Sequence, residues 1–275
     1  MTIARRMAAS VLVLIALLAL GANLWAPAPY DRQFREFPSQ SPGRSFLLGT
    51  DELGRDRLSR LLYGAQVSLL LAPAAAALTV LVALAVGLPA GLFGGLADRV
   101  ATAVIDLFLC LPWFFVLLAV RAMLPLNTGP WTSVTITFLL LGLLGWASGA
   151  RVVRSAARSL VASDYALQAR AAGCGAMSLM RVHLLPALRP IVVSQFWLAI
   201  PAFLLAEANL GMLGLGVAEP MPSLGNSLAE LSNIHSVAAA PWTLAPAAVL
   251  LASLMCLHLL LSRPSQFAQA QGEFR

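Results

Sequence analysis

The chain has 275 residues, of which 59% are hydrophobic and 11% are charged, and its mean hydropathy is +0.82. Soluble domains have charged groups on about a quarter of their residues, so this composition excludes a soluble domain and indicates an integral membrane protein. The net charge is +6 without any lysine; because the arginines cluster at the ends of apolar runs, we attribute it to membrane orientation and not to nucleic-acid binding.

Residues 7–24 form the first apolar run, directly after Arg5 and Arg6. Its length is close to the roughly 20 residues that a helix needs to cross a bilayer. A cleaved signal peptide has a similar beginning, but Trp25 and its neighbours make a poor small-residue cleavage site. We therefore expect an uncleaved membrane span over 1–27, with a short cytoplasmic N-terminus and with Trp25 at the membrane interface.

Residues 28–66 are polar, and after a first span that leaves the cytoplasm they lie on the outer face. Thr50 or Asp51 is placed to cap a helix by accepting a bond from a backbone N–H group. The helix that follows has one apolar face, formed by Leu58, Leu61, Leu62 and Ala65. This pattern predicts an interfacial helix that lies along the membrane before the chain turns into the bilayer.

Two further apolar runs, over 67–92 and 100–120, predict the second and third spans, joined by a short inner turn at 94–99. The third run contains Asp106. An acid within a membrane span costs several kcal/mol unless it is paired, so it is a functional candidate by default. Because Asp106 lies near the inner end, we favour a structural bond to a neighbouring span over a proton relay.

Residues 121–130 are expected to form a short outer loop, and 131–149 the fourth span. Beyond that span, three arginines recur at i, i+3 and i+7, which places them on one face of a helix that leaves the membrane. They are Arg151, Arg154 and Arg158. We expect these side chains to contact lipid phosphates.

The longest polar interruption in the second half of the chain is 163–190, where arginines outnumber the single acid, Asp164. A basic segment between two spans is expected on the cytoplasmic side. It reads as two short helices. Ser163 or Asp164 can cap the first helix, and Gly173 and Gly175 can end it.

The second of these helices places Met177, Met180 and Leu184 on one side, before Pro186 and Pro190 end it. A pair of short amphipathic helices held between two spans suits docking into a groove on a soluble partner. The alternative interpretation is an ordinary basic loop at the membrane surface.

Residues 191–217 predict a fifth span, which contains Glu207. The loop at 218–240 contains acids but no arginine, as expected for the outer side. A sixth span at 241–262 then leaves a cytoplasmic tail at 263–275. The cysteines and histidines are scattered, so no catalytic, cofactor-binding or metal-ligating residues are expected.

The loop at 163–190 resembles the EAA loop of ABC importer permeases, in which Glu-Ala-Ala, three residues and Gly are followed by Leu-Pro. The start departs from that pattern, because Leu167, Gln168 and Ala169 occupy it. The residues that match the peptide and nickel importer branch are Tyr165, Ala169, Arg170, Gly173, His183, Leu184, Leu185 and Pro186. The resemblance implies that 151–190 is an ATPase-coupling loop, with Ala176 and Met177 also at the contact.

Residues 48–69 and 205–228 resemble the same family, in the right order on either side of that loop. We identify the chain as similar to the C-type, or second-permease, branch of the dipeptide, oligopeptide and nickel importers. The resemblance implies an all-α, polytopic membrane protein with six transmembrane helices and the type I ABC importer permease fold. Its permease core would be 67–262, with five of the spans.

The resemblance implies that the chain lies in a bacterial inner membrane, in contact with its lipids. It also implies three kinds of partner: a second homologous permease, two cytoplasmic ATP-binding subunits that hold ATP and Mg²⁺, and an extracytoplasmic substrate-binding protein. The chain is then not an enzyme, since without lysine it has no Gly-x-x-x-x-Gly-Lys phosphate loop. Peptides are the expected substrate, with nickel or another small solute as the alternative. Glu207 and Asn209 either line the pathway or bond to the partner permease.

A rival hypothesis is an ion-coupled secondary transporter with a site built around Asp106 or Glu207. It leaves the docking loop unexplained.

Overall fold

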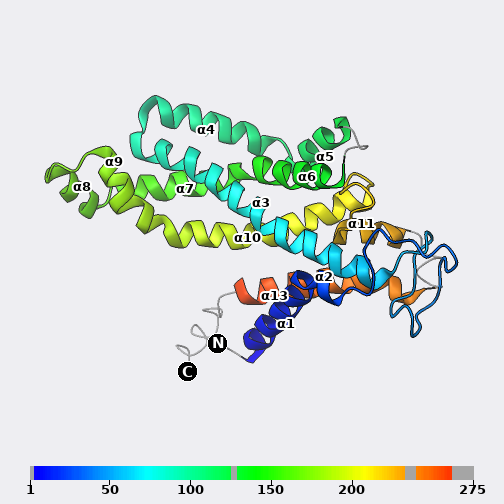
Figure 1. Ribbon diagram of the computed structural model, residues 1–275. Helices are drawn as coiled ribbons and strands as arrows, with labels where there is room; N and C mark the ends of the chain where they lie inside the picture. The colour runs from blue at the N-terminus through cyan, green and yellow to red at the C-terminus, as the bar shows by residue number, and fades with distance from the viewer. Residues whose placement is uncertain (1–2, 125–128, 233–239, 262–275) are drawn as a thin grey trace, which may run out of the picture. The chain divides into compact units, whose positions relative to one another are not determined.

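The computed structural model describes residues 3–124, 129–232 and 240–261, and within these ranges the regular structure is helical (Figure 1). Extended pairing there is limited to two isolated bridges, Gln33 with Arg55 and Thr50 with Asp56. The all-α prediction is confirmed. The chain divides into two compact units, which are described separately: Met1–Leu69 with Pro222–Arg275, and Leu70–Met221.

In the first unit, the long apolar helices α1 (Ile3–Leu20) and α13 (Ala245–Leu261) pack against each other. Both are apolar enough to cross a membrane, as the first and sixth predicted spans require. The short elements of this unit are α2 (Ala22–Trp25), α11 (Leu224–Ala229) and the 3₁₀ helices η2 (Glu230–Ser232) and η3 (Pro241–Leu244). The predicted tail at 263–275 lies outside the described residues.

The helix α3 (Arg57–Phe93) runs without interruption through the predicted interfacial helix and second span, so the expected turn between them is wrong. Its N-terminus is capped by Asp56, whose Oδ2 accepts the backbone N–H of Ser59 at 2.8 Å. The predicted caps are therefore also wrong. Asp51 instead closes the preceding turn, because its Oδ1 accepts the backbone N–H groups of Leu53 and Arg55.

The second unit contains the remaining helices (Figure 1). They are α4 (Gly95–Cys110), α5 (Trp113–Met123), α6 (Pro130–Leu144), α7 (Trp146–Val161), α8 (Asp164–Ala171), α9 (Ala176–Ser178), the π-helix η1 (Leu179–Leu184) and α10 (Leu185–Met212). The predicted inner turn at 94–99 is shorter than expected, since α4 already begins at Gly95.

Within this unit, α3 approaches α7 closely at Gly87 and Gly91. A Cβ on Gly87 would lie 2.5 Å from the backbone oxygen of Ala150, and one on Gly91 would lie 2.7 Å from the Cβ of Ala157. Such distances leave no room for a side chain. The Gly-x-x-x-Gly spacing therefore lets two membrane helices pack backbone to backbone.

The described residues contain five helices long and apolar enough to cross a membrane, or six if α4 and α5 form one bent span. The third predicted span, over 100–120, is not one continuous helix, because it falls on α4 and α5, which meet at an angle of 77°. Leu111 is extended there and Pro112 caps α5. Proline lacks an N–H group and disfavours helical conformation in the residue before it, which explains the break.

Candidate functional site

The predicted coupling loop lies at the end of the hairpin that α7 and α10 form, where α8 and α9 lie together (Figure 1). The predicted bounds, 151–190, also include the last part of α7, all of α8, α9 and η1, and the first part of α10. The apolar helix that begins in α6 extends to Val161, and the next continuous helix begins at Ala176. The loop is therefore a compact segment of one short helix and two turns.

Gly173 ends α8, as the sequence predicts. Its φ is +85°, a conformation that residues with a side chain adopt only with strain. The backbone N–H of Gly173 donates to the oxygen of Arg170, and that of Cys174 donates to the oxygen of Ala169. This pair of bonds is a Schellman motif, which satisfies the last carbonyls of a helix. It turns the chain sharply between α8 and α9.

At the other end of α8, Ser163 occupies the capping position, but its side chain does not cap the helix. The hydroxyl donates instead to the backbone oxygen of Leu160 at 2.6 Å. The prediction of a side-chain cap by Ser163 or Asp164 is therefore wrong, because the serine closes the preceding turn.

The second helix does not end at Pro186 or Pro190, since the chain stays helical from Ala176 to Met212. Before Pro186 the helix widens into the π-helix η1, and Pro186 falls in the first turn of α10. A π-helix changes the spacing of side chains around the axis. The predicted apolar face is therefore wrong, because Leu184 is fully buried and Met177 is 53% exposed.

A small apolar core attaches the loop to the membrane helices. Ala166 of α8 and Leu179 and Leu184 of η1 are fully buried, in one cluster with Leu88 of α3 and Val153 of α7. The partly buried members of the cluster that come from the loop include Ala169, Cys174, Met180 and Leu185. Because protein cores are close-packed and transmit displacement, movement of the loop is passed directly to α3, α7 and α10.

The opposite surface of the loop is exposed and mixes apolar with basic groups. Tyr165 is 42% exposed and its ring contacts the half-buried His183 edge to face, at 5.2 Å between centroids. The other exposed predicted residues are Arg170, Gly173, Ala176, Met177 and Pro186, and Leu167 and Val182 are exposed beside them. The structure thus brings the predicted residues together: Ala169 and Leu185 pack against the core, His183 is half-buried, and the others are exposed.

The three arginines of α7 are paired with acids of α4, so the prediction that they bind lipid phosphates is not supported. Arg154 binds both carboxylate oxygens of Asp98, and Arg158 contacts Oδ2 of Asp98 at 3.2 Å. Arg151 pairs with Asp106, so the predicted bond from Asp106 to a neighbouring span is present. A signal for this pairing was present in the sequence: the two acids, Asp98 and Asp106, are eight residues apart, and the arginines recur at i, i+3 and i+7.

Glu207 and Asn209, the two candidate residues near the end of α10, have different surroundings. The side chain of Glu207 is fully buried, whereas Asn209 is exposed. The role of either residue in the pathway or at the partner permease stays a prediction.

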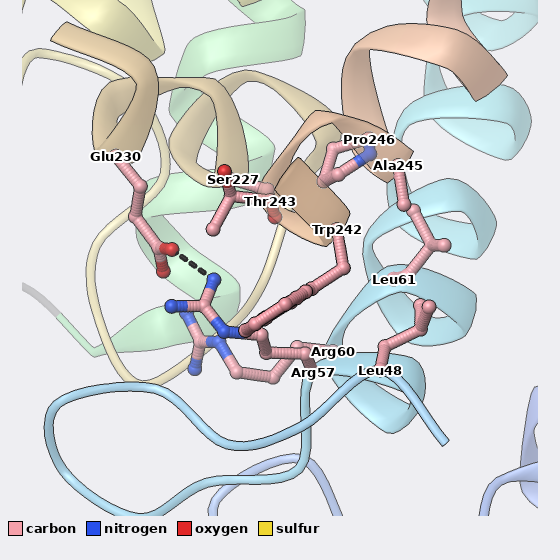
Figure 2. A pocket seen from close by; sticks show the side chains of 10 residues that line it. All are labelled: Leu48, Arg57, Arg60, Leu61, Ser227, Glu230, Trp242, Thr243, Ala245 and Pro246. Carbon is pink, nitrogen blue, oxygen red and sulfur yellow. Dashed lines mark hydrogen bonds and ion pairs between the residues drawn. The ribbon is translucent and has the colours of Figure 1, made fainter. Parts of the chain in front are cut away.

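The first unit contains a small pocket where α3 begins (Figure 2). Arg57 forms an ion pair with Glu230 of η2 across one side of it, and Arg60 and Trp242 also line it. Its volume of about 20 Å³ suffices for a single water molecule. This pocket is therefore too small to be a substrate site.

No group of three or more potential metal ligands occurs among the residues that the structure describes. The apolar helices of the described residues define a multi-pass membrane component. Residues 58–263 match the family described as "Binding-protein-dependent transport system inner membrane component". The chain therefore belongs to this family, and it has the permease fold of type I ABC importers.

Three relatives illustrate the range of the family. The chain is 34% identical to a di/tripeptide transport system permease protein of Pseudomonas aeruginosa, with 90% of this chain and 83% of the relative covered. An oligopeptide transport system permease protein of Mycobacterium bovis is also 34% identical, with 91% and 86% covered. A nickel transport system permease protein of Escherichia coli shows the same identity, with 80% and 77% covered.

These findings confirm the predicted permease family and the multi-pass membrane class. They also set aside the ion-coupled secondary transporter, because the family is the membrane component of binding-protein-dependent transport systems.

Proposed function

We propose that this chain is one of two permease subunits through which an ATP-driven importer moves peptides across a bacterial inner membrane. The observation that supports the proposal most strongly is the loop from α8 to η1. It is fixed to the membrane helices by buried Ala166, Leu179 and Leu184, yet it displays Tyr165 and Met177. A rigid segment with an exposed apolar and basic surface suits docking into a groove of a soluble subunit.

The partners in this proposal are a second homologous permease, two cytoplasmic ATP-binding subunits and an extracytoplasmic substrate-binding protein. ATP and Mg²⁺ are bound by the ATP-binding subunits, and this chain supplies the coupling. Closure of those subunits displaces α8 and α9, and the core around Leu179 passes the displacement to α7 and α10. Such rigid-body movement of packed helices alternates access between the two sides of the membrane.

The proposal places the loop and both termini in the cytoplasm. The basis is the excess of arginine between 151 and 189 and the absence of arginine between 218 and 240.

Peptides are proposed as the substrate because two of the relatives described above are named for di/tripeptide and oligopeptide transport. The nickel transport permease of equal identity makes nickel the second candidate. Direct uptake of a labelled dipeptide and of nickel ions by the assembled importer distinguishes the two.

Cysteine cross-linking tests the docking. The native cysteines Cys110, Cys174 and Cys256 are first replaced, and Met177→Cys is introduced into the assembled complex. The control is Met212→Cys, because Met212 is similarly exposed, at 47% against 53%, and lies at the opposite end of the same continuous helix. We expect Met177→Cys alone to cross-link to an ATP-binding subunit. Absence of its cross-link in every nucleotide state would contradict the proposal.

A further inference from the structure

A cavity of about 180 Å³, partly open to the surface, lies in the second unit and is lined by α3, α5, the junction of α6 with α7, and α10. Its polar lining comes from Thr79, Ser148 and Gln195, on three different helices. Its aromatic lining comes from Trp113 and Phe203, whose ring centroids lie 6.2 Å apart in an edge-to-face arrangement. None of the residues that line it is charged.

Glycines keep this space open. A Cβ on Gly145 would lie 2.9 Å from the ring of Phe203, and a Cβ on Gly149 would lie 3.2 Å from the Cβ of Ala83 and 3.7 Å from Oε1 of Gln195. Side chains at these two positions would therefore crowd the walls of the cavity. Because Gly149 has no side chain, the space between α7 and the carboxamide of Gln195 stays open.

Two of the polar groups have no partner within the described part of the chain. Neither the carboxamide of Gln195 nor the hydroxyl of Ser148 forms a hydrogen bond there, whereas the hydroxyl of Thr79 donates to the backbone oxygen of Gly142 at 2.7 Å. Ser148 and Gln195 lie in helices apolar enough to cross the membrane. Ser148 is exposed and Gln195 is half-buried, so both groups are accessible to a polar ligand from the open side of the cavity.

We propose that this cavity is the part of the translocation pathway that this chain supplies, and that Gln195 binds a peptide group of the substrate there. A carboxamide both donates and accepts, as a peptide unit does, and Ser148 and Thr79 offer further acceptors. The aromatic rings suit an apolar side chain. The lining lacks the imidazole, thiolate and carboxylate groups that bind nickel.

This inference rests on the proposed function and specifies its substrate. The cavity is smaller than the roughly 300–1,000 Å³ of a complete small-molecule site. It therefore holds one part of a peptide, and the remainder of the peptide lies against the second permease.

The test uses the whole importer, with its partner subunits, in proteoliposomes supplied with ATP and radiolabelled dialanine. Gln195→Leu removes the carboxamide, and Ser148→Ala removes the hydroxyl. Losing a hydrogen bond worth about 1–1.5 kcal/mol predicts roughly tenfold slower dipeptide uptake by Gln195→Leu. Subunit composition and ATP hydrolysis stimulated by the loaded binding protein are expected to stay unchanged. The control is Ser194→Ala, on the same helix but outside the cavity lining.

A further variant, Gln195→Glu, gives a result that misfolding cannot produce. The introduced carboxylate is expected to lower uptake of dialanine and to favour a lysine-containing dipeptide, because it attracts the cationic side chain. The measurement is the ratio of the two uptake rates in competition.

Three results would overturn the inference. Unchanged uptake by both Gln195→Leu and Ser148→Ala would show that the cavity does not meet the substrate. Loss of the second permease from the Gln195→Leu complex would show that the cavity is filled by that subunit. Uptake of nickel and not of dipeptide by the wild-type importer would reject peptides as the substrate. Because this result needs no variant, it distinguishes failure of the proposed function from failure of the proposed role of the cavity.

Discussion

At the scale of single residues, Gly173 determines the shape of the coupling loop. Its positive φ of 85° permits the two Schellman bonds that reverse the chain after α8. No atom lies within 4 Å of the place where its Cβ would be. Any cost of adding a side chain is therefore backbone strain and not a clash, which makes the position a clean test of conformation.

We predict that Gly173→Ala weakens coupling. A left-handed backbone costs a residue with a side chain about 1–2 kcal/mol, which lowers the population of the native turn roughly five- to thirtyfold. The measurement is ATP-driven uptake together with retention of the ATP-binding subunits on purification. Gly175→Ala is the matched control, because Gly175 also has open space around it but its φ is −70°. Equal effects of the two substitutions would contradict the argument.

At the scale of elements, α4 and α7 are joined by two ionic contacts that differ in exposure. Asp98 and Arg154 have side chains that are 13% and 19% exposed, whereas Asp106 and Arg151 are 50% and 55% exposed. Exposed ion pairs contribute little, but removing one partner of a more enclosed pair leaves a charge without compensation. The two contacts are therefore unequal in their effect on stability.

We predict that Asp98→Asn lowers the Tm of the purified complex clearly more than Asp106→Asn does. Asp98 binds Arg154 through both carboxylate oxygens and also contacts Arg158, and the amide keeps the size of the side chain while removing its charge. Thermal unfolding in mild detergent gives the comparison. A larger decrease for Asp106→Asn would show that exposure does not govern these pairs.

The elements also show which features the sequence could predict. The spans and the end of α8 at Gly173 follow from local signals, namely long apolar runs and a glycine at the right distance from a helix start. The pairing of Asp98 with Arg154 joins two residues that lie 56 positions apart in sequence, on different helices. The burial of Glu207 likewise depends on tertiary packing. Periodicity along one helix does not by itself identify the helix that packs against it, and only the matched spacing of acids and arginines points to the pairing of α4 with α7.

Prolines have more than one structural use in this chain. Pro186 was expected to end a helix but lies in the first turn of α10, after a π-helix. Pro112 falls within the third predicted span, where it occupies the N-cap position of α5 after a sharp bend. A proline excludes an N–H bond at its own position, and the surrounding packing decides whether the helix ends, widens or bends.

At the scale of the whole molecule, the proposed function requires two opposite faces. Residues 28–56 form an ordered segment tied to α3, because the hydroxyl of Ser59 accepts the backbone N–H of Ala28 and Arg57 donates to the backbone oxygen of Thr50. In the proposed orientation this segment faces the external binding protein. The loop around Gly173 faces the ATP-binding subunits. A single chain then links recognition outside to energy input inside.

This orientation is tested by labelling with a membrane-impermeant maleimide. In a background without native cysteines, Ser41→Cys and Ala172→Cys each place a thiol at an exposed position, one in the outer segment and one in the coupling loop. We expect Ser41→Cys to react in intact spheroplasts and Ala172→Cys to react only in inside-out vesicles, since a charged maleimide does not cross the hydrocarbon core. Permeabilised cells, in which both thiols must react, provide the control. The reverse pattern would place the loop on the outer side, away from ATP, and would reject its role in coupling. Reaction of both thiols from the same side would show that the number of membrane crossings between Ser41 and Ala172 is even and not odd.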